Sequence, residues 1–210
     1  MMITLPPAPR LVVMTKAPQP GRVKTRLIPA LGAEGAAAMH TALVSATLDR
    51  VRRSGLDVVI AMGGDYQGAF ARSLERQGFT VLPQAPGDLG ERLKRALTGP
   101  GRRLAIGTDC PIFSPRWLAD AAERPEPVVL GPAEDGGYWM ICVDAPQDAL
   151  FDDVPWSTEA VLKTTVDRAK AMGLAVHMAP TCYDIDTPLD LKRLLEDPRC
   201  PLGVRTVARR

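Results

Sequence analysis

No aspartate or glutamate occurs before Glu34 in this chain of 210 residues. Metal-binding cysteine patterns are also missing: the four cysteines show no C-x-x-C spacing and only two histidines accompany them, which argues against a zinc site. A disulfide framework is not expected either, because such frameworks belong to small domains with little core, whereas 46% of these residues are hydrophobic. We therefore expect four reduced, mostly buried thiols.

Long apolar runs are missing as well. No run approaches the roughly 20 residues that a transmembrane helix needs, and the proline-rich residues 1–10 lack the apolar centre of a signal peptide. The net charge is only +2, from 26 basic and 24 acidic residues, whereas a general nucleic-acid-binding protein would show a broad basic surface. We expect a soluble cytoplasmic protein with no nucleic-acid partner and no membrane insertion.

Short apolar runs alternate with helical patterns along the chain. Strands are expected over residues 11–14, 57–62, 79–82, 103–107, 127–130, 138–143 and 175–178. Helices are expected over residues 32–53, 67–77, 88–97, 115–123, 157–172 and 187–195. Strands that are continuously apolar and separated by helices predict a mostly parallel sheet with helices on both faces. Only residues 131–155 break the alternation. We predict a single α/β domain over residues 1–210, with flexible ends at 1–9 and 199–210.

The stretch without acids contains a basic loop directly after the first predicted strand. Residues 16–26 hold two prolines, a glycine and four cations, namely Lys16, Arg22, Lys24 and Arg26. Gly21 would let the backbone approach a ligand. The end of a buried strand is where an open α/β sheet holds its ligand, so the loop predicts phosphate binding. It does not have the G-x-x-x-x-G-K-[ST] order of a P-loop, and the alternative is an ordinary solvated basic loop.

Acidic residues in two segments could form a site together with this loop. Asp109 follows the predicted strand 103–107, at the carboxyl edge of the sheet, where an acid can hold a divalent cation; the alternative is a turn or a helix cap. Asp184 and Asp186 are two residues apart just before a helix start, and Asp186 could be a second metal ligand or a capping-region acid. The pairing of Asp109 with Asp186 is a hypothesis that the sequence cannot test.

A glycine turn is a further candidate. In Asp135-Gly136-Gly137-Tyr138 the glycines permit close contact with a ligand, Tyr138 could stack on a base or sugar, and Asp135 could act as a base. The competing interpretation is a hairpin turn.

Two helix entrances complete the candidates. Asp88 and Arg92 could face a ligand at the start of the helix 88–97, or Asp88 could simply cap it. Trp156, beside the presumptive cap Ser157, is either a core anchor or a wall of the acceptor site.

Six segments, taken in order, resemble one family of GT-A-like glycosyltransferases in the nucleotide-diphospho-sugar transferase superfamily. They are K-A-P-Q-P-G-R-V-K-T-R-L at 16–27, G-D-L-G-E-R at 87–92, G-T-D-C-P at 107–111, D-G-G-Y at 135–138, W-S-T at 156–158 and D-I-D-T-P at 184–188. Members are named as glycosyltransferase-like proteins, some linked to arsenosugar biosynthesis or to selenium. The family is similar to the guanylyltransferases of molybdopterin and phospholactate metabolism. The resemblance spans residues 11 to 195.

This resemblance implies a Rossmann-like three-layer α/β/α GT-A fold. It implies that the loop 16–26 holds donor phosphates, that Asp109 and Asp186 bind Mg²⁺ or Mn²⁺, and that Gly136 and Gly137 lie near the acceptor. One departure is that Asp109 is followed by Cys110-Pro111, whereas sugar-transferring GT-A enzymes carry Asp-x-Asp at this place.

The resulting prediction is a metal-dependent transferase with a nucleotide-activated donor. The leading interpretation is glycosyl transfer from a nucleotide sugar to a small-molecule acceptor. The alternatives are nucleotidyl transfer of guanylyl or cytidylyl type from an NTP to a phosphorylated small molecule, and a catalytically idle nucleotide-binding module. The predicted catalytic residues are Lys24, Asp109 and Asp135. The oligomeric state is not predicted.

Overall fold

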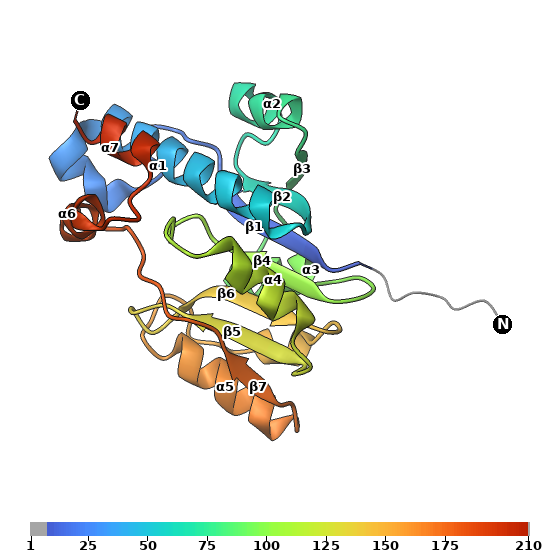
Figure 1. The fold of residues 1–210 in the computed structure, drawn as a ribbon. Coiled ribbons are helices and arrows are strands. Elements are labelled where there is room, and N and C mark those ends of the chain that lie inside the picture. Colours follow the sequence, from blue (N-terminus) through green and yellow to red (C-terminus); the bar gives the residue numbers. More distant parts are fainter. Residues whose placement is uncertain (1–7, 210) are drawn as a thin grey trace.

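A seven-stranded sheet runs through the middle of the molecule in the computed structural model, which describes residues 8–209 (Figure 1). Its strand order is β3-β2-β1-β4-β6-β5-β7. The strands are β1 (Arg10–Lys16), β2 (Asp57–Gly63), β3 (Thr80–Pro83), β4 (Arg103–Ile106), β5 (Val128–Pro132), β6 (Tyr138–Val143) and β7 (Val176–Met178). Only β6 runs antiparallel to its neighbours β4 and β5, so the predicted mostly parallel sheet and its break over residues 131–155 are confirmed.

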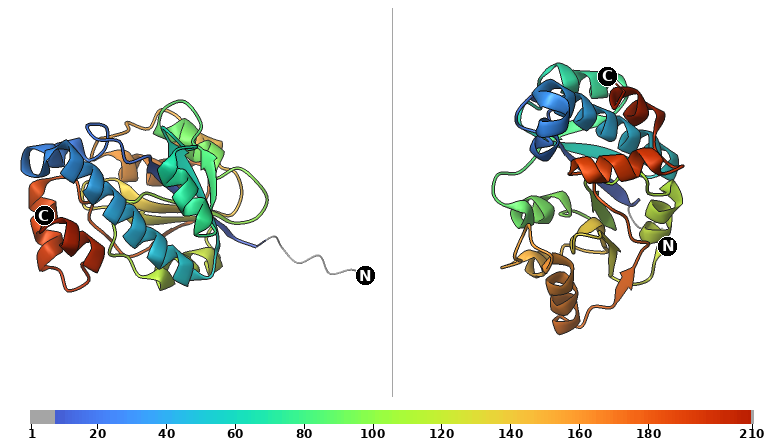
Figure 2. Two further views of the ribbon diagram at one scale, coloured as in Figure 1. Left: turned by 90° about the horizontal axis from the view of Figure 1, so that it is seen from above. Right: turned by 90° about the vertical axis from the view of Figure 1, so that its left-hand side faces the viewer.

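Helices cover both faces of the sheet, which makes three layers (Figure 2). Side chains along β4 alternate between two buried clusters: Leu104 and Ile106 pack on one face and Ala105 on the other, as the twofold period of a strand requires. The first face carries α1 (Ile28–Val51), α2 (Ala69–Arg76), α4 (Pro115–Glu123), α6 (Pro188–Glu196) and α7 (Leu202–Val207). The second face carries α3 (Leu89–Ala96) and α5 (Val161–Ala171).

The long helix α1 is the main cover of the first face. It is interrupted at Gly32, whose φ of 69° is left-handed, so that regular helix follows from about the predicted start. The segment Thr25–Ser54, which includes α1, is long and apolar enough to cross a membrane by length and composition alone. Met39, Leu43 and Val44 are nevertheless fully buried in the core. The apolar character of α1 is therefore explained by packing against the sheet.

The structure departs most from the predicted elements at two places. The helix expected to begin at Ser157 begins at Val161, because Ser157 is left-handed (φ 65°) and the N–H of Leu162 bonds the carbonyl of Gly136 (2.9 Å). Ser157 therefore does not cap the helix. At the other end, α7 was not expected: its Val204 is fully buried, and α7 packs beside α1 (Figure 1). Most of the predicted flexible end 1–9, together with Arg210, lies outside the described residues.

All four cysteines are free and buried, as predicted.

Candidate metal–nucleotide site

A cavity of about 450 Å³ opens at the carboxyl ends of β1 and β4. The chain runs from β1 to β2 and β3 on one side and then returns to β4 on the other, so the cavity lies at the point where the strand order reverses. Ligands of open α/β sheets bind at such a point. The predicted site residues that line it are Lys16, Arg22, Lys24, Arg26, Arg92, Asp109, Tyr138 and Asp186.

The basic loop is held in place by its apolar residues. Val23 and Leu27 are buried in the core on either side of Lys24, and the N–H of Ala17 bonds the carbonyl of Gly63 at 2.8 Å. Lys24 itself takes a left-handed conformation (φ 45°, ψ 44°) just before the short 3₁₀ turn Thr25–Leu27. This conformation is uncommon for a side chain larger than glycine and is typical of functional loops. The backbone therefore directs Lys24 inward while Arg22 and Arg26 stay exposed.

Lys24 is the central ion of the cavity. Its Nζ forms an ion pair with Asp109 and lies 3.0 Å from Oδ1 of Asp186, and only 4% of its side chain is exposed. Burial acts to lower the pKa of Lys24, but the two carboxylates outweigh it and raise that pKa above its ordinary value. Burial likewise acts to raise the pKa of Asp109, and the ammonium of Lys24 lowers it. Lys24 and Asp109 are therefore both charged at neutral pH.

Backbone bonding brings the two acidic segments together. The N–H of Ile185 donates to the carbonyl of Asp109 (3.0 Å), so the segment 182–187 lies against the loop after β4. The competing role for Asp186 falls to Asp190: the carboxylate of Asp190 accepts the N–H groups of Asp186 (3.2 Å) and Thr187 (2.7 Å) in a capping box for α6. The carboxylate of Asp186 is thus left to face the cavity.

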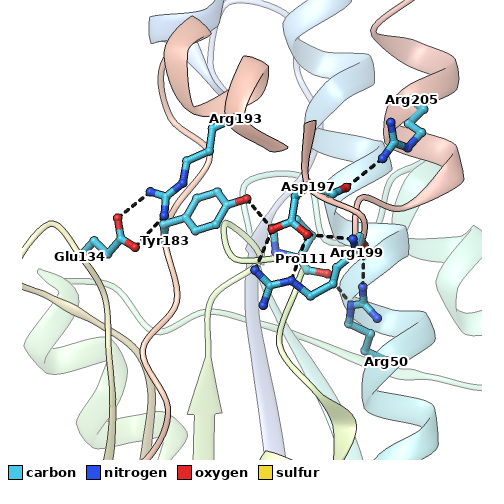
Figure 3. Close-up of polar contacts among 8 residues, drawn as sticks. All are labelled: Arg50, Pro111, Glu134, Tyr183, Arg193, Asp197, Arg199 and Arg205. Atoms are coloured by element: carbon cyan, nitrogen blue, oxygen red, sulfur yellow. Dashed lines mark hydrogen bonds and ion pairs between the residues drawn. The ribbon is translucent and has the colours of Figure 1, made fainter. Parts of the chain in front are cut away.

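Contacts of several arginines hold the loop after β4 and the segment 182–187 in place (Figure 3). Arg193 of α6 stacks on the ring of Tyr183 and forms two bonds with Glu134, at 2.6 and 2.8 Å. Nε of Arg50 donates to the carbonyl of Pro111, two residues after Asp109. Bidentate and stacked arginine contacts restrict orientation as well as distance. The network therefore positions the Asp109 loop and the segment 182–187 relative to the glycine turn.

Asp184 is a third carboxylate in the cavity, which sequence analysis did not assign to the site. Its Oδ1 accepts a bond from the thiol of Cys110 (2.8 Å), and burial raises the pKa of this carboxyl to about 6. The neighbouring charges of Asp109, Asp135 and Asp186 act in the same direction. Asp184 therefore changes charge just below neutral pH.

This pKa predicts a pH-dependent stability. Between about pH 4 and 6 the unfolded chain releases the Asp184 proton while the folded protein keeps it, so the free energy of unfolding falls as pH rises through that window. Asp184→Asn should remove the loss and stabilise the metal-free protein by about 1–3 kcal/mol at pH 7.5, with no gain at pH 4. Urea unfolding in EDTA measures this, with Glu75→Gln, at an exposed carboxyl on α2, as control. A gain that is the same at both pH values would contradict the assignment.

Two further residues of the cavity, Gln84 and His40, were not predicted from the sequence as site residues. Nε2 of Gln84 donates to the carbonyls of Thr15 (2.8 Å) and Ala61 (3.0 Å), and Gln84 follows β3 directly, a carboxyl-edge position that is the signal for it. His40 is buried, and its Nε2 lies 2.9 Å from the carbonyl of Lys16. Burial lowers the pKa of His40, so its ring is neutral and braces the start of the basic loop.

Six predicted site residues do not line the cavity. Asp88 caps α3 by accepting the N–H of Glu91 at 2.9 Å. The side chain of Asp135 is exposed and accepts the N–H of Gly137 (2.9 Å). The others are Gly21, Gly136, Gly137 and Trp156. Trp156 packs against the second core cluster. Their assignments to catalysis, phosphate binding or acceptor binding stay predictions.

The carboxylate oxygens around Lys24 are of the type that binds a hard divalent cation. Asp109 and Asp186 turn carboxylate oxygens toward one cationic centre, which is the ligand type that Mg²⁺ and Mn²⁺ prefer. Within residues 8–209, neither this cavity nor any other place brings three or more metal-binding side chains together. Mg²⁺ sites commonly consist of one or two carboxylates completed by water and substrate phosphates, so two carboxylates are sufficient.

The fold is that of nucleotide-diphospho-sugar transferases, as the sequence resemblance implied. The chain belongs to the DUF2064 family, described as "uncharacterized protein conserved in bacteria", whose model matches residues 47–158. Comparison with curated proteins gave no significant match.

Solved structures share the whole fold. A candidate nucleotide-diphospho-sugar transferase from Desulfovibrio desulfuricans G20 is 26% identical over 96% of both chains, with a TM-score of 0.84. The inositol-1-phosphate CTP transferase from T. maritima is 13% identical, with a TM-score of 0.63, over 97% of this chain and 98% of its own. Rv0371c from Mycobacterium tuberculosis H37Rv, solved with manganese, is 18% identical, with a TM-score of 0.55, over 91% and 100%.

Proposed function

We propose that this protein is a divalent-metal-dependent transferase that uses a nucleotide-activated donor. The observation that carries the proposal is the ion cluster of Lys24, Asp109 and Asp186 inside a cavity rimmed by further cations. In this proposal Lys16, Arg22, Arg26 and Arg92 bind phosphate oxygens, and their charges stabilise the negative charge that builds on the leaving phosphate. A divalent cation held by Asp109 and Asp186 would supply further charge neutralisation there.

The charge of the cavity favours nucleotidyl transfer from an NTP. Five basic side chains line it against three acidic ones, and a divalent metal adds two positive charges to this excess. A nucleoside triphosphate carries about four negative charges and a nucleotide sugar about two, and electrostatic complementarity selects the more highly charged donor. This reverses the order of the two reactions expected from the sequence.

Glycosyl transfer from a nucleotide sugar stays the second candidate. It is supported by the name of the Desulfovibrio protein, which is 26% identical and matches nearly the full length. The acceptor in either reaction would be a small molecule. Asp135, which is exposed and does not line the cavity, remains the proposed acceptor base.

Ligand-dependent stability and product analysis test the proposal. Each of CTP, GTP, UTP, ATP and UDP-sugars is added with and without Mg²⁺, and the melting temperature is measured, because a ligand that binds only the folded state must raise it. A true donor should raise the melting temperature by several degrees in the presence of Mg²⁺.

With acceptor mixtures, release of pyrophosphate identifies nucleotidyl transfer and release of NDP identifies glycosyl transfer. Strong nucleotide binding that needs no metal and gives no product would contradict the proposal that the protein is an enzyme. It would support a catalytically idle nucleotide-binding module.

A further inference from the structure

The two lysines of the cavity differ in their surroundings. Lys16 is exposed and forms no ion pair within residues 8–209. Lys24 is nearly fully enclosed, with its Nζ between the carboxylates of Asp109 and Asp186, while Arg26 reaches Oδ2 of Asp186 only at 3.6 Å. An ammonium therefore lies at the point where both carboxylate groups converge.

A divalent cation bound by both carboxylates would need the same point. Its oxygen ligands lie at about 2.1 Å, closer than the oxygens around Nζ of Lys24, so there is no room for both cations between the two acids. Two neighbouring positive charges would also repel one another strongly in this enclosed place. Metal binding thus requires that the ammonium of Lys24 moves away.

The cavity offers Lys24 another partner. Lys16, Arg22, Arg26 and Arg92 line the same cavity, so it attracts anions, and the phosphates of a donor would lie among these cations. A phosphate oxygen can replace a carboxylate as the partner of Lys24, whereas without phosphate the displaced ammonium would lose both of its partners and stay enclosed.

We propose that Lys24 is an internal cation that holds the metal position of Asp109 and Asp186, and that donor phosphates draw it away so that metal and nucleotide bind together. The inference rests on the proposed metal–nucleotide site. It gives Lys24 two partners in succession, first the carboxylates and then phosphate. It also means that the protein alone binds metal weakly, although its carboxylates are already in position.

The test is Mn²⁺ binding to the full chain without nucleotide, followed by electron paramagnetic resonance of the free ion. Lys24→Met removes the ammonium and keeps the length of the side chain. We expect it to bind Mn²⁺ about tenfold or more tighter than the natural protein, which is within the range of coupled binding equilibria.

Lys16→Met is the matched control. It removes one positive charge from the same cavity without freeing the carboxylates, so its Mn²⁺ affinity should change about threefold or less. Adding Asp109→Asn to Lys24→Met should abolish the gained affinity. If Lys24→Met binds Mn²⁺ no tighter than the natural protein, or no tighter than Lys16→Met, the proposal is overturned.

A second readout guards against misfolding. Without metal, Lys24→Met leaves two carboxylates facing one another and should melt at a lower temperature; Mn²⁺ alone should raise that temperature more than it raises that of the natural protein. Lys24→Gln, which keeps a polar side chain, should behave in the same way if Lys24→Met is too unstable to purify. Failure of the proposed function would show differently, as natural protein that no nucleotide stabilises, so the two failures are distinguishable.

Discussion

Asp109→Asn is expected to lower the turnover of the natural donor by about 10²–10³-fold, the cost of removing one group that neutralises charge in a transition state. The change keeps the shape of the side chain and removes the charge that pairs with Lys24 and that the proposed divalent metal would need. Metal-dependent nucleotide binding, measured by calorimetry with and without Mg²⁺, should be lost together with turnover.

The protein should stay folded in this variant, because Asp186 still pairs with Lys24 and the backbone bond from Ile185 to the carbonyl of Asp109 does not involve the side chain. Asp120→Asn, at an exposed acid on α4, serves as the control and should change neither property. Unchanged Mg²⁺-dependent binding in Asp109→Asn would remove Asp109 from the metal site.

Gly136→Ala is expected to destabilise the protein by about 3–5 kcal/mol, the largest loss of stability that we predict for a single methyl group. Gly136 is left-handed (φ +87°), and an added Cβ would lie 2.2 Å from the carbonyl oxygen of Glu159. Both the backbone and the space therefore oppose any side chain.

Gly173→Ala separates these two causes. Gly173 has a similar φ of +72° but nothing within 4 Å of an added Cβ, so this variant should lose only the conformational cost of about 1–2 kcal/mol. Urea unfolding of both variants gives the comparison. Equal losses would mean that the contact with Glu159 is relieved at no cost.

Gly136 also shows how function and structure compete to explain one residue. The sequence placed Gly136 near the acceptor by resemblance, and the structure adds a packing reason, since an added Cβ would overlap the backbone of Glu159. A loss of activity in Gly136→Ala would therefore be informative only beside the measured stability.

The fold was predictable because its strands are continuously apolar and its turns are marked by glycine and proline. The alternation of Leu104, Ala105 and Ile106 between two helix layers follows from the twofold period of a strand alone. The helix α7 was missed because its single buried anchor, Val204, lies among arginines in a short segment whose pattern resembles a solvated tail. Ser157 was taken for a cap because serine before a helical pattern is a common N-cap. Its left-handed backbone (φ 65°) is not visible in the sequence.

The lining of the cavity was predictable where a residue follows the end of a strand within a few positions. Asp109 and the basic loop were found on that ground, and the same ground would have found Gln84. The pairing of Lys24 with carboxylates was not predictable. The Lys24 side chain points toward them rather than toward solvent because its backbone is left-handed and because Asp186, far away in the chain, lies beside it. The raised pKa of Asp184 likewise depends on burial, which no spacing of residues reveals.

The bond between Lys24 and Asp186 joins residues 162 positions apart, so this side of the cavity forms only after residue 186 has been synthesised. During synthesis the basic loop leaves the ribosome before Asp186, the later of the two acids that pair with Lys24. The ion cluster is complete only when the segment 182–187 packs against the loop after β4. Contacts of such long range also slow folding, because the intervening chain must be ordered before they form. Until then the four cations of residues 16–26 lack the charge of Asp186, so the local balance of charge in the nascent chain differs from that in the finished fold.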